Sequence, residues 1–197
     1  MMNRCQWVGN EPIYIEYHDK EWGVPVHDDN KLFEFIILEG AQAGLSWLTI
    51  LKRRENYRKA FAGFDAEKVA RFNEKKINEL LTDRGIIRNK LKIQSAVTNA
   101  QAFLRIQEEF GSFDAYSWQF VGGQCKVNKL KTIKEIPATS IESDALSKDL
   151  KTRGFKFVGS TIIYAHMQAV GMVNDHTTDC FRYRELHPNR DSDYFNK

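Results

Sequence analysis

The chain has 197 residues, of which 42% are hydrophobic and 28% charged, the balance of an ordinary globular protein. This length suggests one domain, or two small ones that share a core. No apolar run approaches the roughly 20 residues that cross a bilayer, and the N-terminus does not resemble a signal peptide. The net charge of +3 is too small to argue alone for a polyanionic partner. Three scattered cysteines exclude a disulfide framework and favour a reducing cytoplasm.

The beginning of the chain combines metal-capable side chains with large rings. Chain ends are usually polar and frayed, so this composition raises the question of what anchors the segment. The stretch "RCQWVGNEPIYIEYHDKEWG" at residues 4–23 contains Cys5, Trp7, Tyr14, Tyr17, His18 and Trp22.

Helical patterns follow this opening. The stretch "DNKLFEFIILEGAQAGL" has a candidate N-cap at Asp29 or Asn30 and is apolar on nearly every side, which predicts a helix at the centre of the core. The next helix can begin at an N-cap Ser46, and Asp65 and Ser112 are further cap candidates.

Later segments continue the helical period. Residues 93–104 carry one apolar stripe, and Val158, Ile162, Ala165, Ala169 and Met172 form another. Residues 122–142 break the period, so we expect an extended surface connection there.

Because strand-like alternation is weak, we predict a compact all-α domain of about eight to ten short helices. We expect this domain to span residues 1–180 and a poorly ordered tail to span 181–197.

A second pair of metal-capable residues lies near the end of this domain. The motif "NDHTTDC" places His176 and Cys180 four residues apart, so a helical turn would bring both side chains to one face. With Cys5 and His18 they would make a closed tetrahedral Zn²⁺ site, which is structural because no position is left for water. Spacing alone favours the simpler alternative of a buried thiol and an unrelated surface histidine.

Glu39 stands in an unusual setting, at the end of the most apolar stretch and eight residues before Trp47. A carboxylate among apolar groups is costly unless a positive or hydrogen-bonding group meets it. One interpretation is an ordinary ion pair or cap. The other is a pocket in which the carboxylate and the rings of Trp7, Tyr14, Tyr17, Trp22 and Trp47 bind a flat, cationic ligand such as a charged nucleobase. Any single one of these rings is more often plain core.

Basic residues gather locally despite the small net charge. Clusters occur at Lys52–Arg54, Arg84–Lys92, Lys126–Lys134 and Lys148–Lys156. Such clusters attract phosphates, although they also occur as solvated helix faces.

Seven segments in this order resemble the bacterial 3-methyladenine DNA glycosylase I family, from about residue 4 to residue 180. They are "RCQWV", "YHDKEWG", "LEGAQAGLSW", "ILKRRENYRKAF", "GIIRNKLKI", "ALSKDLKTRGFKFVG" and "NDH". The resemblance implies a helix–hairpin–helix DNA glycosylase that flips 3-methyladenine out of alkylated double-stranded DNA, hydrolyses its N-glycosidic bond and leaves an abasic site and the free base.

The resemblance also implies roles for individual residues. Glu39 would recognise the base, and the aromatic residues named above would line its pocket. One structural zinc would be held by Cys5, His18, His176 and Cys180. Leu45 would fill the gap in the duplex, although ordinary packing is the simpler role for a leucine there. Gly85, Arg88 and Lys90, with Lys92 nearby, would contact DNA at the hairpin.

The sequence departs from the larger group at two points. The hairpin has a single glycine, Gly85, and no acid lies between Asp83 and Glu108 where many relatives carry a catalytic Asp. No lyase-type lysine can be assigned from the sequence, so we predict a monofunctional enzyme, and nothing in the sequence suggests more than a monomer. Two alternatives are a zinc-stabilised nucleic-acid-binding module without catalysis and a small-molecule hydrolase of charged heterocycles; release of free base from methylated duplex DNA separates them.

Overall fold

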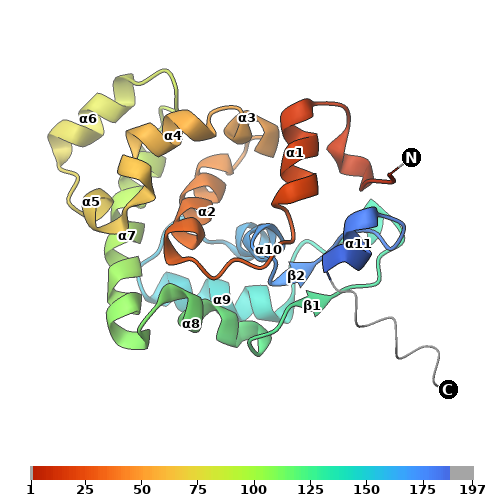
Figure 1. Ribbon diagram of the computed structural model, residues 1–197. Coiled ribbons are helices and arrows are strands. Elements are labelled where there is room, and N and C mark those ends of the chain that lie inside the picture. The colour runs from red at the N-terminus through yellow and green to blue at the C-terminus, as the bar shows by residue number, and fades with distance from the viewer. Residues whose placement is uncertain (1, 187–197) are drawn as a thin grey trace.

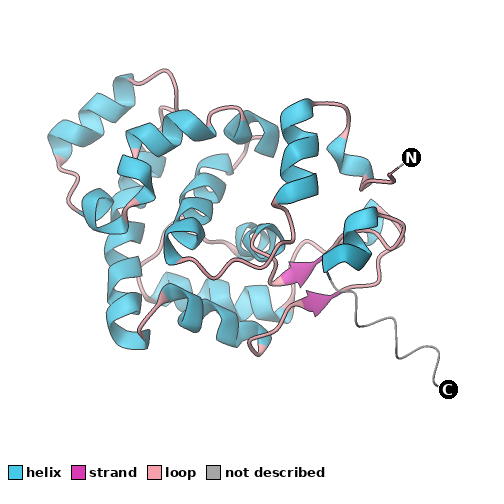
Figure 2. Ribbon diagram, viewed as in Figure 1, coloured by secondary structure: helices cyan, strands magenta, loops and turns pink. Residues whose placement is uncertain are grey.

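The computed structural model describes residues 2–186, which fold almost entirely into helices (Figures 1 and 2). The described part contains eleven α-helices, four short 3₁₀ helices and two strands of two residues each. The all-α prediction is confirmed, with more helices than expected. The elements are η1 (Gln6–Val8), α1 (Pro12–Lys20), α2 (Asp29–Gln42), α3 (Trp47–Leu51), α4 (Arg54–Ala60), η2 (Ala62–Phe64), α5 (Ala66–Ala70), α6 (Glu74–Thr82), α7 (Lys90–Phe110), α8 (Phe113–Trp118), η3 (Gln119–Val121), β1 (Lys126–Val127), η4 (Ile133–Glu135), α9 (Ile141–Thr152), α10 (Ser160–Ala169), β2 (Val173–Asn174) and α11 (Phe181–Leu186).

Helix α2 is the centre of the core, as its composition predicts. Every residue from 32 to 41 is buried, including two glutamates. The N-cap is Asp28, whose carboxylate accepts the backbone N–H of Lys31 at 2.8 Å, so neither Asp29 nor Asn30 is the cap. Asp29 instead accepts two backbone N–H bonds from the first turn of α8, at 2.8 Å each, and ties the two helices together.

The two strands are the main departure from an all-helical chain. Lys126 and Val127 pair in parallel with Val173 and Asn174. The predicted connection at 122–142 is otherwise turns and loops with one 3₁₀ turn up to Ser140, the N-cap of α9, which begins two residues earlier than expected. A two-residue pairing leaves no alternating pattern in the sequence.

The two ends of the described chain lie side by side (Figure 1). The prediction of a loose tail from Phe181 onward is wrong for Phe181–Leu186, which form α11. The backbone N–H of Phe181 donates to the carbonyl of Asn3 at 3.0 Å, so contact with the N-terminal segment holds the start of this helix. Positions 187–197 of the predicted tail lie outside the described residues. Within residues 2–186, no helix has the length and apolarity needed to cross a membrane.

Four elements converge beside the centre of the molecule: α1, the end of α2, the start of α3 and α10 (Figure 1). The turn between α2 and α3 needs Gly44, whose φ of +77° is disfavoured for other residues. Lys92 of α7 donates to the carbonyls of Ala41 and Ala43, at 2.8 and 2.6 Å, and so fixes the end of α2 that carries Glu39.

Candidate functional site

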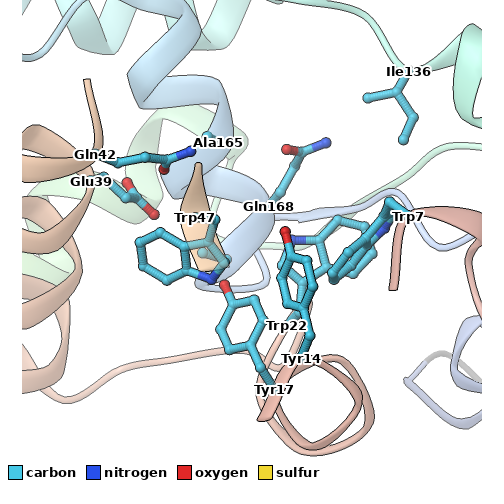
Figure 3. Close-up of a pocket in the computed structure, with 11 residues that line it drawn as sticks. Trp7, Tyr14, Tyr17, Trp22, Glu39, Gln42, Trp47, Ile136, Ala165 and Gln168 are labelled. Carbon is cyan, nitrogen blue, oxygen red and sulfur yellow. The ribbon is translucent and has the colours of Figure 1, made fainter. Parts of the chain in front are cut away.

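A cavity of about 210 Å³ lies where these four elements meet. The structure brings together Glu39 and all five rings that the sequence analysis singled out, from η1, α1 and the turn after it, α2 and α3 (Figure 3). The complete lining is Trp7, Tyr14, Tyr17, Trp22, Glu39, Gln42, Trp47, Ile136, Ala165, Gln168 and Ala169.

The rings support one another by edge and tilted contacts. The ring centroid of Trp7 lies 5.0 Å from that of Tyr14 and 4.9 Å from that of Trp22. Across the cavity, Tyr17 lies 5.5 Å from Trp47. Such pairs favour fixed relative orientations, so the cavity walls are preorganised. The indole N–H of Trp47 is buried and finds no hydrogen-bond partner in the described part of the chain.

Glu39 enters the cavity from the last full turn of α2, with its carboxylate directed toward Trp47 (Figure 3). Its side chain is 4% exposed, and Nδ1 of His166 in α10 lies 3.3 Å from its Oε2. Burial raises the pKa of Glu39, and His166 opposes that increase. The same burial, with the nearby negative charge of Glu39, raises the pKa of Tyr17 and keeps its phenol neutral.

Gln168 is a cavity residue that sequence reasoning missed. Its amide nitrogen donates to the carboxylate of Asp175 at 2.7 Å, and Tyr164 donates to the same oxygen at 2.7 Å. This fixes the amide, so its oxygen remains as an acceptor at the cavity wall (Figure 3). The sequence indicates its place in the cavity only through its position three residues after Ala165, which also lines the cavity.

The predicted stripe on α10 also needs correction. Val158, Ala169 and Met172 of the stripe are buried as expected, whereas Ile162 and Ala165 are only half-buried. The helix buries Ile163, Tyr164, His166 and Met167 in addition. Ala165 lies at the cavity, so part of the stripe that periodicity assigned to the core is pocket wall.

Two cysteines and two histidines form a buried cluster, as the family resemblance implied; the simpler alternative that spacing favoured, with an unrelated surface histidine, is wrong. The ligand atoms of Cys5, His18, His176 and Cys180 all lie within 4.8 Å of one another, a donor set that can hold one metal ion. The Sγ atom of Cys180 lies 3.5 Å from Nε2 of His18 and 3.5 Å from Nδ1 of His176. The hydrogen bond from Cys5 lowers the pKa of the Cys180 thiol most, and the contacts with His176 and His18 lower it further.

The second nitrogen of each imidazole is occupied elsewhere. Nδ1 of His18 donates to Asp19 at 2.8 Å, and Asp19 in turn accepts from Arg4. Nε2 of His176 donates to the carbonyl of Trp22 at 3.1 Å. These contacts select the tautomers that leave the other nitrogens facing the two sulfur atoms, the usual arrangement around a metal-binding imidazole.

The Cys/His cluster is also the support of the aromatic wall. The ring of Trp22 lies 4.5 Å from that of His176, and the ring of Trp7 lies 5.4 Å from that of His18. The cluster therefore explains why the sequence begins with metal-capable and aromatic residues. It joins the N-terminal segment to the end of the described chain, and it supports one wall of the cavity.

The predicted DNA-contacting residues lie on two loops. Leu45 is 40% exposed and lies on the turn after α2, beside Gln42 at the cavity edge. Gly85 lies in the loop 83–89 between α6 and α7, where a Cβ atom would come within 2.9 Å of Asn56. Arg88 is exposed at the end of that loop, and Lys90 is exposed at the first position of α7.

Two basic residues of the predicted clusters make contacts within the protein instead of facing solvent. Arg54 is buried in an ion-pair network with Glu34 and Glu21, and so it is unavailable to a phosphate. Lys92 caps α2, as described above, and its burial lowers its pKa. In contrast, Arg53, Arg84 and Arg88 line one polar hollow beside the loop 83–89.

Comparison with known proteins agrees with this geometry. The sequence matches the family described as methyladenine glycosylase over residues 7–183. It is 53% identical over 182 residues to DNA-3-methyladenine glycosylase 1 of Escherichia coli, covering 92% of this chain and 97% of the relative. It is 47% identical to DNA-3-methyladenine glycosylase of Haemophilus influenzae, covering 91% and 97% of the two chains.

The fold agrees as well. A solved structure of 3-methyladenine DNA glycosylase I from Staphylococcus aureus, described for its recognition of 3-methyladenine, superposes with a TM-score of 0.88 at 38% identity, covering 91% of this chain and 95% of that one. Family, sequence and fold therefore coincide over nearly the whole described chain. The chain belongs to the methyladenine glycosylase family and is a glycosylase, an enzyme that acts on N-glycosidic bonds.

Proposed function

We propose that this enzyme excises 3-methyladenine from alkylated double-stranded DNA, by flipping the base into the aromatic cavity and hydrolysing its N-glycosidic bond. The observation that carries the proposal is the Glu39 carboxylate, buried among five aromatic rings in a single cavity. The relatives named above share this activity by name, and the Staphylococcus aureus protein recognises 3-methyladenine.

The chemistry of the lesion suits this cavity. Alkylation at adenine N3 makes the base cationic and hence a good leaving group, so little general-acid help is required. Rings stack on a flipped base with about 1–3 kcal/mol each, by analogy with single-strand binding platforms. The carboxylate of Glu39 would accept a hydrogen bond from the exocyclic amine and stabilise the positive charge in the low-dielectric cavity. The same negative charge is available to the sugar cation that develops as the bond breaks.

Extraction of the base costs a few kcal/mol, less for a lesion that pairs poorly. Leu45, 40% exposed beside Gln42 at the cavity edge, would occupy the space that the base leaves. We assign the α6–loop–α7 segment as the helical hairpin, in which the amides around Gly85 and the charges of Arg88 and Lys90 hold the DNA backbone. Glu39 has no lysine nucleophile beside it in the cavity lining, which supports a monofunctional reaction that leaves an abasic site.

We also propose that the Cys/His cluster holds one structural Zn²⁺. Zinc bonds of about 2.3 Å to sulfur and 2.0–2.1 Å to nitrogen place tetrahedral ligands about 3.5 Å apart, the S···N separation in this cluster. Two thiolates and two imidazoles suit zinc in charge and softness. The ion would take no part in the reaction, because four protein ligands close its coordination sphere.

The metal assignment has a direct test. Elemental analysis of protein purified without added metal should find one zinc per chain, and Cys180→Ala should lose it. Full zinc occupancy in that variant would remove Cys180 from the ligand set.

The activity itself is tested with methylated duplex DNA. Purified enzyme should release 3-methyladenine, identified by chromatography, in amounts equal to the abasic sites formed. Strand breaks should appear only after alkali, because a monofunctional glycosylase does not cut the backbone. Absence of free base would overturn the proposed activity, and breaks without alkali would overturn the monofunctional assignment.

A further inference from the structure

Helix α10 carries a histidine that the proposed chemistry has not used. His166 is 2% exposed and faces Glu39 across the interface between α10 and α2. Its Nδ1 lies 3.3 Å from Oε2 of Glu39. Neither ring nitrogen of His166, nor that carboxylate oxygen, makes a hydrogen bond within residues 2–186, so the 3.3 Å approach is a close contact that falls short of hydrogen-bond geometry.

Such a pair is an exception to the usual satisfaction of buried polar groups. A buried imidazole without a partner costs free energy, and so does a buried carboxylate. Each group is therefore the available partner of the other. Hydrogen bonds around an active site are often long before substrate binds and tighten in the complex.

We propose that His166 is a positioning residue for Glu39: Nδ1–H donates to the carboxylate, fixes its direction into the cavity and keeps it in the charged form. This inference rests on the proposed function, since it assigns a second residue to the same site. Glu39 needs such a donor because its carboxylate is buried. Without a donor, a carboxylate among rings favours its protonated form, which offers a cationic base no negative charge.

The other titratable groups near Glu39 do not stabilise its negative charge. Tyr17 of α1 is the other titratable group that interacts with Glu39, and burial keeps its phenol neutral. Asp175, beyond the cavity wall, is saturated by hydrogen bonds from Tyr164, Asn128 and Gln168. Burial raises the pKa of Glu39, and the interaction with His166 is what opposes it.

Three substitutions separate a positioning role from a packing role. His166→Phe keeps a flat ring and removes the donor. His166→Asn places an amide N–H near the position of Nδ1, whereas His166→Gln places one near Nε2, away from Glu39. A matched control is His27→Phe, which removes an exposed histidine bonded at 2.8 Å to Asp114, outside the cavity lining.

The first readout is the pH profile of 3-methyladenine release. Activity should fall on the acidic side as Glu39 becomes protonated. In His166→Phe this limb should move to higher pH by roughly one to two units, because a hydrogen bond to a charged group is lost. His166→Gln should move it in the same direction, and His166→Asn should stay close to the wild-type profile, as should His27→Phe.

The second readout does not depend on activity. The side-chain carboxyl carbon of Glu39 can be titrated by NMR in protein with ¹³C-labelled glutamate, its resonance assigned by its loss in Glu39→Gln. The midpoint should rise in His166→Phe and His166→Gln, but not in His166→Asn. An unchanged midpoint in folded His166→Phe, or in His166→Gln if the first variant does not fold, would overturn the role of His166. A wild-type protein that shows these titrations but releases no base would overturn the proposed function instead.

Discussion

Helix α2 buries two glutamates, five residues apart, whose charged neighbours differ. Glu34 is 4% exposed and Glu39 is 3% exposed, so the degree of burial does not distinguish them. Glu34 is surrounded by cations: Arg54 at 2.6 Å, Arg58 at 3.1 Å and Lys31 at 3.1 Å. Glu39 faces one histidine.

The electrostatic consequences have opposite signs. Burial tends to raise the pKa of Glu34, but the charge and hydrogen bonds of Arg54 and Lys31 outweigh it and hold the pKa below its usual range. At Glu39 burial prevails and the pKa is raised. A buried acid therefore marks a functional site only when its charge is left without full compensation inside the protein, so that a ligand can supply the rest.

The largest effect expected from this comparison is on the reaction. Glu39→Gln should lower release of 3-methyladenine about 100- to 1,000-fold, the loss typical of a group that stabilises transition-state charge. Stability should be unchanged or slightly higher, because a neutral amide is less costly to bury. Base release and thermal unfolding measure the two quantities, and full activity in a folded Glu39→Gln variant would remove Glu39 from the mechanism.

The same substitution at the other position should affect the fold. Glu34→Gln leaves Arg54 buried with a weaker partner, which should reduce the free energy of unfolding by about 3 kcal/mol. The estimate lies at the low end of such losses because Glu21 still pairs with Arg54. Folded Glu34→Gln should retain base release per molecule. Denaturant unfolding measures the loss, and a variant as stable as wild type would contradict the assigned role.

Ligand-linked stability gives a smaller effect. Free 3-methyladenine at ten times its Kd should stabilise the wild type by about 1.4 kcal/mol, raising Tm by roughly 3–5 °C for a chain of this size. Glu34→Gln should show the same increment from its lower starting Tm, whereas Glu39→Gln should show little. Equal increments in both variants would mean that the rings alone bind the base.

Local features of the fold were predictable from the sequence because their causes are local. Ser46, Asp65 and Ser112 each accept a backbone N–H of the first helical turn, as expected of their cap positions. The apolar stripe at residues 93–104 lies in α7. The strands and α11 depend on contacts between distant segments, such as Phe181 with Asn3, which leave no local pattern.

The residues of the site also divide into those that the local sequence indicates and those that only contacts between distant segments reveal. Glu39 was conspicuous because its own neighbours in the sequence are apolar, whereas the spacing of the four Cys/His residues favoured no common site and only the family resemblance joined them. His166 was not, because a histidine on an apolar helix looks like ordinary core until α10 is seen packed against α2. Arg54 was misread as part of a basic surface, since a charge cluster does not reveal which member turns inward.

The smallest expected effect is on the pH dependence of the free energy of unfolding. The folded-state pKa of Glu34 lies below the ordinary glutamate value of 4.5, and that of Glu39 lies above it. Glu34, with a lowered folded pKa, contributes stability that is fully present above 4.5 and is lost as pH falls through the folded value. Glu39, with a raised folded pKa, favours the folded state most below 4.5, and this contribution is lost as pH rises through its folded value. Denaturant unfolding across pH should therefore show the loss in Glu34→Gln shrinking below pH 4.5, whereas any gain in Glu39→Gln grows only above it. Coincident pH windows for the two variants would mean that their environments do not differ in the way the ion pairs indicate.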